Sequence, residues 1–357
     1  MTWSALVVVV LASGSSAQQC TPESHIIDLK NIGYPQDICK WAKGIQIEFL
    51  DSVRLLVSFP LHPSPCNLPN ALMTEERRAA VVDVSGKILR SLDLQPGQLV
   101  RAGPNGHILL LAEKELSLLD ADFSEIQTFP WPKEAVDSTG HIPFSAWAGR
   151  NISLTPSRGG FAIEGRYPNY GVTYFEGNPV KLVTAISSCS QLATVTDGGF
   201  ACFEQSPQSK LVVHLVGGGW DLEDSRFEKR EWVALPIPDR VLLLTSKFQL
   251  YDFQRGGSVK LLAGLHWLAP GLYTPGSTYT VTSSAAHRIL VTSSGCWFPL
   301  NDTTGIGYYE RVVVVDYLSE ELIFRKQYSI GSDVTISPDG HLLAIREKNR
   351  LSVVALP

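Results

Sequence analysis

Apolar residues along the chain come in short runs that are rich in Val, Ile, Leu, Phe and Tyr, and Gly, Pro, Asn, Asp or Ser bound each run. Hardly any window spaces its apolar residues three and four positions apart, as an amphipathic helix requires. Short runs between turn-forming residues are typical of β-strands joined by tight turns. The pattern therefore predicts an all-β fold.

Two distant segments of the chain share Pro, Gly, His, Leu, Glu and Lys at matching positions. Residues 103–114 read GPNGHILLLAEK, and residues 337–348 read SPDGHLLAIREK. A further apolar run follows each segment, at 116–119 and at 351–354. A match of this kind, separated by most of the chain, indicates that one structural unit has been duplicated.

A recurring aspartate indicates the length of this unit. An apolar run that ends in Asp, followed by a turn and another run, occurs at Asp83, Asp120, Asp252 and Asp316. Their spacing fits a repeat of about 40 to 45 residues, which is typical of the four-stranded blade of a β-propeller. Because each aspartate ends a strand, we expect it to cap the next turn rather than to act in acid–base chemistry.

The predicted strands divide into seven blades. They cover residues 45–94, 99–129, 141–186, 187–217, 232–263, 279–326 and 334–355. Six blades is the alternative, if 141–186 and 187–217 form one irregular unit. The last blade has three strands before the chain ends at Pro357, so we expect residues 25–30 to pair with 351–355 and close the ring.

The segment 334–344, VTISPDGHLLA, gives a family resemblance. It resembles the repeat of YVTN-type propellers, and the chain as a whole resembles the quinoprotein amine dehydrogenase heavy-chain-like superfamily of seven-bladed β-propellers. The motif is clear once and weaker at 103–112, where Asn105 replaces the aspartate. The resemblance implies a scaffold or docking surface, with any redox chemistry carried by a partner chain or an added domain.

The N-terminus has the features of a secretory signal peptide. Residues 5–12 are continuously apolar, which is too short to span a bilayer, and Ser15 and Ala17 fit a cleavage site before Gln18. Residues 1–4 carry no Lys or Arg, which departs from the usual pattern. We expect a signal peptide at 1–17, a single propeller domain at 18–357 without a transmembrane segment, and an exported protein that is periplasmic or extracellular.

Charge and cysteines bear on partners and compartment. The chain has 30 Lys and Arg against 35 Asp and Glu, which argues against a nucleic-acid partner. Its 6 cysteines permit disulfides in an exported protein, and their spacing is unlike that of a zinc site. A turn at 197–199 would place Cys202 opposite Val195, so we do not expect it to bond to Cys189.

The remaining chemistry gives no reaction. His107 and His341 occupy equivalent repeat positions, and we expect both to begin a strand after a turn rather than to bind a metal. An acidic segment at 221–224 lacks the spacing of a calcium loop. We therefore predict no metal site and no cofactor.

Segments that break the repeat are the best candidates for a binding surface, because repeated residues serve the fold. These segments are 60–75, 165–175, 217–230 and 297–309. We expect at least two of them to lie on one face of the ring. The aromatic residues expected to contact a ligand are Tyr167, Tyr170, Trp220, Trp297 and Tyr308.

The sequence thus favours a non-enzymatic propeller that binds a protein, a glycan or a small molecule at one face. The alternative is an enzyme of lactonase or quinoprotein type, with its site at the central channel. Such an enzyme would place several Asp, Glu, Asn or His residues with shifted pKa values near the axis.

Overall fold

The computed structural model describes most of the chain. The described residues are 24–35, 45–62, 76–131, 152–156, 159–165, 171–187, 189–196, 199–204, 210–215, 219–223, 232–237, 240–244, 249–256, 258–264, 278–283, 287–297, 307–329 and 333–357. Over these ranges the strands form seven sheets, each with four strands. All the strand pairs within these sheets are antiparallel, so the predicted all-β fold of four-stranded units is confirmed.

Six of these sheets are built from consecutive strands. The first three are β2 (Gln46–Phe49), β3 (Arg54–Pro60), β4 (Arg77–Asp83), β5 (Ile88–Leu94); β6 (Leu99–Ala102), β7 (Ile108–Leu111), β8 (Glu115–Leu119), β9 (Glu125–Pro130); and β10 (Ile152–Pro156), β11 (Gly160–Gly165), β12 (Gly171–Glu176), β13 (Lys181–Ile186). The next three are β14 (Cys189–Thr196), β15 (Gly199–Glu204), β16 (Lys210–Leu215), β17 (Trp220–Glu223); β18 (Trp232–Ile237), β19 (Arg240–Leu244), β20 (Gln249–Gln254), β21 (Val259–Gly264); and β22 (Thr278–Ser283), β23 (Arg288–Trp297), β24 (Gly307–Asp316), β25 (Glu321–Ser329).

The remaining sheet joins the two ends of the chain. Its order is β26 (Asp333–Ile336), β27 (Leu342–Glu347), β28 (Arg350–Ala355) and then β1 (Ser24–Asp28). The predicted pairing is present: His25 lies opposite Val353, and Ile27 lies opposite Leu351. A short 3₁₀ helix, η1 (Leu29–Ile32), follows β1, and the Leu29 N–H donates to the Asn349 carbonyl over 2.9 Å.

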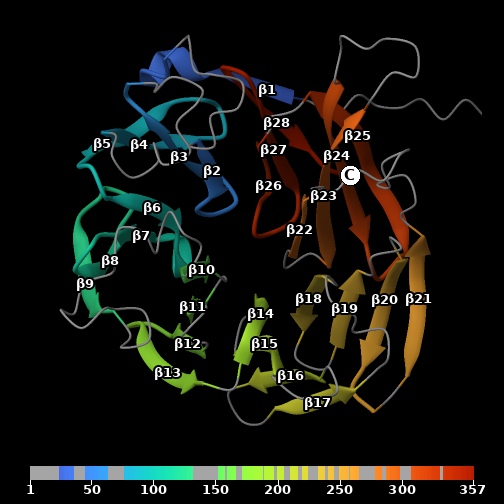
Figure 1. Cartoon of the computed structure of the whole chain (residues 1–357). Coiled ribbons are helices and arrows are strands. Elements are labelled where there is room, and N and C mark those ends of the chain that lie inside the picture. The colour runs from blue at the N-terminus through green and yellow to red at the C-terminus, as the bar shows by residue number, and fades with distance from the viewer. Residues whose placement is uncertain are drawn as a thin grey trace, which may run out of the picture.

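The sheets stand around a common centre, as Figure 1 shows, with the first strand of each sheet inside and the fourth outside. First strands of neighbouring sheets contact one another, as β14 contacts β18 and β2 contacts β26. In five of the seven sheets the register shifts by one residue between the third and fourth strands. Such bulges increase the local twist of the outer strand.

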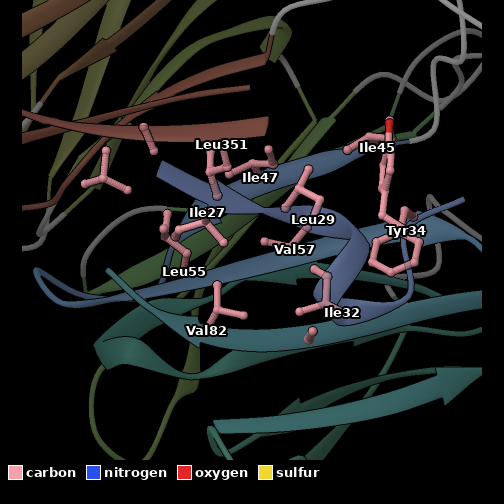
Figure 2. Packing of buried hydrophobic residues seen from close by; sticks show 14 of the residues in the cluster. Ile27, Leu29, Ile32, Tyr34, Ile45, Ile47, Leu55, Val57, Val82 and Leu351 are labelled. Atoms are coloured by element: carbon pink, nitrogen blue, oxygen red, sulfur yellow. The ribbon is translucent and has the colours of Figure 1, made fainter. Parts of the chain in front are cut away.

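The core lies between the sheets. One cluster combines Ile27 and Leu351 of the sheet that joins the chain ends with Leu55, Val57 and Val82 of the next sheet, as Figure 2 shows. Leu29 and Ile32 of η1 belong to the same cluster. Tyr34 packs edge-on against Phe59, with 5.4 Å between the ring centroids. The N-terminal strand is therefore held by apolar burial as well as by backbone pairing.

The cysteine prediction was wrong. Cys189 and Cys202 form a disulfide, and their Cα atoms lie 5.7 Å apart. Cys202 lies opposite Leu192 rather than Val195: the turn is tighter than predicted, because Thr196 pairs with Gly199, and one register shift lies between the turn and Cys202. A second shift, beyond Cys202, places Cys189 opposite Glu204. Among the described residues, no helix is long and apolar enough to cross a membrane.

Candidate functional site

An arginine begins the second strand in three of the described sheets. These residues, which we call the arginine belt, are Arg54 in β3, Arg240 in β19 and Arg288 in β23. Each one reaches a turn of the following sheet. The Arg240 guanidinium lies 5.7 Å from the centroid of the Tyr317 ring. Arg54 lies against Gly106, where an added Cβ atom would be 3.5 Å from Arg54 Nη2. The belt therefore links neighbouring sheets through their turns.

Arg288 donates two hydrogen bonds to the following sheet. Its Nη1 donates to the Gly340 carbonyl over 2.7 Å, and its Nη2 donates to the carbonyl of Pro357. Leu356 is buried, and its N–H donates to the His341 carbonyl over 2.7 Å. The last two residues are thus fixed against the turn between β26 and β27.

The repeated motif forms a turn between the first and second strands of two sheets. In the 337–341 turn, Ser337 Oγ and the His341 N–H donate to Asp339 Oδ1 over 2.5 and 3.1 Å. Burial raises the pKa of Asp339, but these bonds and one from the Ser52 hydroxyl outweigh it and lower the pKa below its ordinary value. Gly106 and Gly340 have φ of 74° and 78°, which explains the glycine in both copies.

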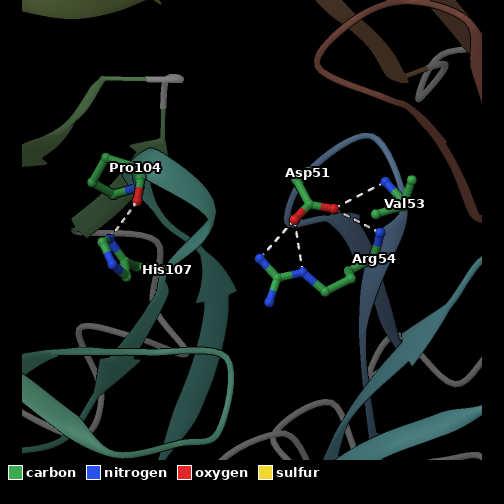
Figure 3. Close-up of polar contacts among 5 residues, drawn as sticks. All are labelled: Asp51, Val53, Arg54, Pro104 and His107. Carbon is green, nitrogen blue, oxygen red and sulfur yellow. Dashed lines mark hydrogen bonds and ion pairs between the residues drawn. The ribbon is translucent and has the colours of Figure 1, made fainter.

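The other copy of the turn faces Arg54, as Figure 3 shows. His107 Nδ1 lies 3.0 Å from the Pro104 carbonyl, and Asp51 Oδ2 accepts from Arg54 Nε over 2.7 Å. Asp51 Oδ1 also accepts from the backbone N–H groups of Val53 and Arg54. His107 and His341 each follow a turn and directly precede a strand, as predicted.

Three of the four recurring aspartates cap turns. Asp83, Asp120 and Asp316 each accept two backbone N–H bonds from the turn that follows. For Asp83 the prediction is also supported by a lowered pKa, caused first by the hydrogen bond from Ser85. The three residues serve the fold.

The prediction was wrong for Asp252. This residue lies inside β20, is 3% exposed, and its Oδ1 is 3.4 Å from Arg240 Nε. Gln254 takes the capping position instead: its N–H donates to the Ser258 carbonyl, just as the Asp83 and Asp120 N–H groups donate to Lys87 and Ser124. Asp252 therefore lies two residues before the position that Asp83 and Asp120 occupy in their sheets.

Two carboxylates lie on innermost strands. Glu48 of β2 accepts from Arg101 Nε and from the Ala102 N–H of β6, both over 2.5 Å. Asp333 of β26 accepts from Arg346 Nε over 2.6 Å. Burial raises the pKa of Asp333 although solvent reaches 36% of its side chain, and the Arg346 cation opposes the shift. Both carboxylates thus join strands of the fold.

The residues predicted to bind a ligand divide between the two ends of the sheets. Tyr167 and Tyr170 lie outside the described residues, in the connection between β11 and β12. Trp297 ends β23 and Tyr308 pairs with Cys296 near the start of β24, whereas Trp220 begins the fourth strand β17. Only the backbone is described at Trp220, Trp297 and Tyr308. Their part in binding stays a prediction.

Three of the four non-repeating segments fall at the same kind of connection. Segments 60–75, 165–175 and 297–309 span the step from the second to the third strand of their sheets, whereas 217–230 surrounds β17. Contacts between Arg288 and Gly340, and between Ser52 and Asp339, place first-to-second turns of neighbouring sheets side by side. Because the strands are antiparallel, residues 60 and 297 then both lie at the opposite face. We call it the connection face.

The β23–β24 hairpin extends past its neighbour β22 toward the connection face. Its strands have 10 residues each and pair as far as Trp297 with Gly307. The first strand β22 ends its pairing at Ser294. Three residue pairs therefore continue past β22, roughly 10 Å at the rise of an extended chain. Among the residues described, no group of three or more His, Cys, Asp or Glu is placed to hold a metal ion.

Comparison with known proteins shows the fold alone. No family model matches the sequence, and no curated protein matches it. A chain in the crystal structure of a mitotic checkpoint complex is 12% identical, with 98% of this chain and 99% of that chain covered and a TM-score of 0.50. The WD40 domain of Pan2 from Neurospora crassa is 10% identical over 93% and 94% of the two chains, with a TM-score of 0.47.

BamB from Moraxella catarrhalis is 11% identical, with 93% of this chain and 91% of that chain covered and a TM-score of 0.38. Four-stranded antiparallel sheets arranged around a common centre are the architecture of a β-propeller. The comparison does not single out the YVTN-type or quinoprotein superfamily, so that resemblance stays a prediction.

Proposed function

We propose that this chain is an exported, non-enzymatic propeller of seven blades, closed by β1 and β28, which binds a partner protein at the connection face. The observation that carries the proposal is the position of the non-repeating segments. Three of them share one kind of connection, and loops that a rigid scaffold gathers on one face are the usual place for binding residues.

The arginine belt supports the choice of face. On the opposite face, which holds the turns between first and second strands, the charged groups of Arg54, Arg288 and Asp339 bond to residues of the fold. Asp83, Asp120 and Asp316 are occupied in the same way. Three of the four segments that the repeat does not explain span connections at the connection face.

A protein partner is favoured over a glycan or a small molecule. The checkpoint-complex chain, whose fold is similar, was crystallised as part of a protein assembly. Trp297 and Tyr308 lie on a hairpin that extends past its neighbour β22, and tryptophan and tyrosine are enriched among the residues that dominate protein interfaces.

Selection of peptides tests the proposal. A phage-displayed library of random peptides is panned against the chain that begins at Gln18, and affinities of the selected peptides are measured by fluorescence polarisation. We expect Trp297→Ala with Tyr308→Ala to weaken binding by about tenfold or more. The control Leu318→Ala, at an exposed position of the turn between β24 and β25 on the opposite face, should leave binding unchanged.

Two results would contradict the proposal. One is a set of peptides that bind both variants equally well, and the other is a library that yields no binder. Export is tested separately: the full chain expressed in a secreting host should appear outside the cytoplasm with Gln18 as its first residue. A retained chain with residues 1–17 intact would refute the export part alone.

A further inference from the structure

The β23–β24 hairpin projects past the strands on both of its sides. β22 pairs with β23 only as far as Ser294, and β25 pairs with β24 only as far as Tyr309. The two strands of the hairpin stay paired with each other as far as Trp297 with Gly307. Among the described strands, none pairs with residues 295–297 on the side of β22. We call this part of β23 the open edge.

The open edge sets β23 apart from the other second strands. β3 also continues past its first strand, but only for two residues, and the last of them is Pro60, which has no N–H to donate. In the remaining five sheets, the second strand ends within one residue of its pairing with the first strand. β23 therefore offers the longest unpaired stretch of this kind in the described part of the chain.

The sequence before β22 explains why the chain leaves this edge open. Counting back from the pair of Thr278 with Ser294, Gly276 would stand opposite Cys296 and Pro275 opposite Trp297. Proline cannot donate to a strand ladder and glycine weakens a strand, so both residues oppose an extension of β22. Every second residue of the open edge then directs its N–H and C=O groups toward the missing neighbour.

We propose that the partner protein binds as an extended strand, which continues the line of β22 and pairs with residues 295–297. The inference rests on the proposed function and adds that recognition runs through the backbone. Unpaired N–H and C=O groups at the edge of a sheet are a template for a strand from another chain. The projecting residues carry no charge that would oppose such a strand; they are Gly295, Cys296, Trp297, Gly307 and Tyr308.

Replacing single amides of a bound peptide tests this proposal on the full mature chain. A peptide selected by panning is resynthesised with an ester in place of one backbone amide at a time, which removes one N–H donor. Because a strand turns alternate residues toward its neighbour, we expect about tenfold weaker binding at every second position of one stretch and little change between them. Esters that weaken binding nowhere, or without alternation, overturn the proposal. They leave the proposed function standing, since it depends on Trp297 and Tyr308 and not on the backbone.

Hydrogen exchange resolved to single residues gives the second measurement. We expect the peptide to slow exchange of at least one amide within 295–297. Unchanged exchange at all of these amides overturns the proposal. Slow exchange there without peptide also overturns it, because another segment of this chain would then cover the edge, or a second copy if the effect grows with protein concentration.

The chain offers a matched pair of variants, because Pro-Gly occurs twice in the connection between β21 and β22. Pro275→Thr with Gly276→Val lets β22 extend along the open edge, so it should slow exchange at 295–297 without peptide and weaken peptide binding about tenfold or more. The control Pro270→Thr with Gly271→Val lies five residues further from β22 and should do neither. Slowed exchange with wild-type affinity overturns the proposal, and where exchange stays fast the ester series decides.

Discussion

The buried pair of Asp252 and Arg240 gives a sharp prediction about stability. Asp252 stands two residues before the capping position of β20, where the equivalent residues of other sheets are Val81 and Leu118. It is a carboxylate at a place that other sheets fill with an apolar side chain. The side chains of Asp252 and Arg240 are 4% and 19% exposed.

The distance gives the magnitude of the attraction. At 3.4 Å, two unit charges attract by about 5 kcal/mol for an effective dielectric constant of about 20. Removing both charges from water costs several kcal/mol per ion, so the pair as a whole adds little. Removing one partner, however, leaves a buried charge without an opposite charge beside it. We expect Asp252→Leu and Arg240→Met each to lower the free energy of unfolding by about 3 to 5 kcal/mol.

The double variant decides between this reasoning and simple loss of contacts. With both charges gone and Leu beside Met, the free energy of unfolding should lie within about 1 kcal/mol of the wild type. Urea titration followed by tryptophan fluorescence measures all four proteins. Losing the exposed pair through Arg90→Met should cost under about 1 kcal/mol. Losses that simply add in the double variant would refute the argument.

Three further predictions follow from the contacts described above. Asp120→Ala should cost about 1 to 3 kcal/mol in urea unfolding, because two turn N–H groups lose their acceptor; an unchanged midpoint would contradict the capping role. Asp339 has a lowered pKa, so its stabilisation is present above its unfolded value of 3.8 and is lost as pH falls through the folded pKa. Asp339→Asn should therefore destabilise the chain at neutral pH and flatten the acid limb of its stability curve, and a parallel acid limb would exclude this role. Deleting residues 18–31 should expose the edge of β28 and cause aggregation in size-exclusion chromatography; a monomer with the wild-type melting temperature would argue against the closing role of β1.

Much of the fold could be predicted because its signals are local. Apolar runs and turn residues indicate the strands, and the missing fourth strand after residue 355 pointed to 25–30. The glycines of the two repeated turns have a local cause as well, since Gly106 and Gly340 adopt positive φ. Because glycine adopts positive φ without steric cost, a glycine at the same place of both repeats indicates this turn in the sequence.

Features that depend on register were harder to predict. Asp252 resembles a strand-ending aspartate until the bond from the Gln254 N–H to the Ser258 carbonyl shows where the turn begins. The bridge from Cys189 to Cys202 depends on two register shifts that no local pattern reveals. The arginine belt was missed for a different reason: its partners lie in the following sheet, and only the order of the sheets brings them together.

The most direct test of the account is a footprint of a bound peptide. Hydrogen exchange with mass spectrometry, performed with and without a peptide selected by panning, reports which backbone segments become protected. The account predicts protection at 60–76, 165–171 and 297–307, the connections between second and third strands. Protection confined to the turns at 50–54, 103–107 and 337–341, on the opposite face, would contradict it.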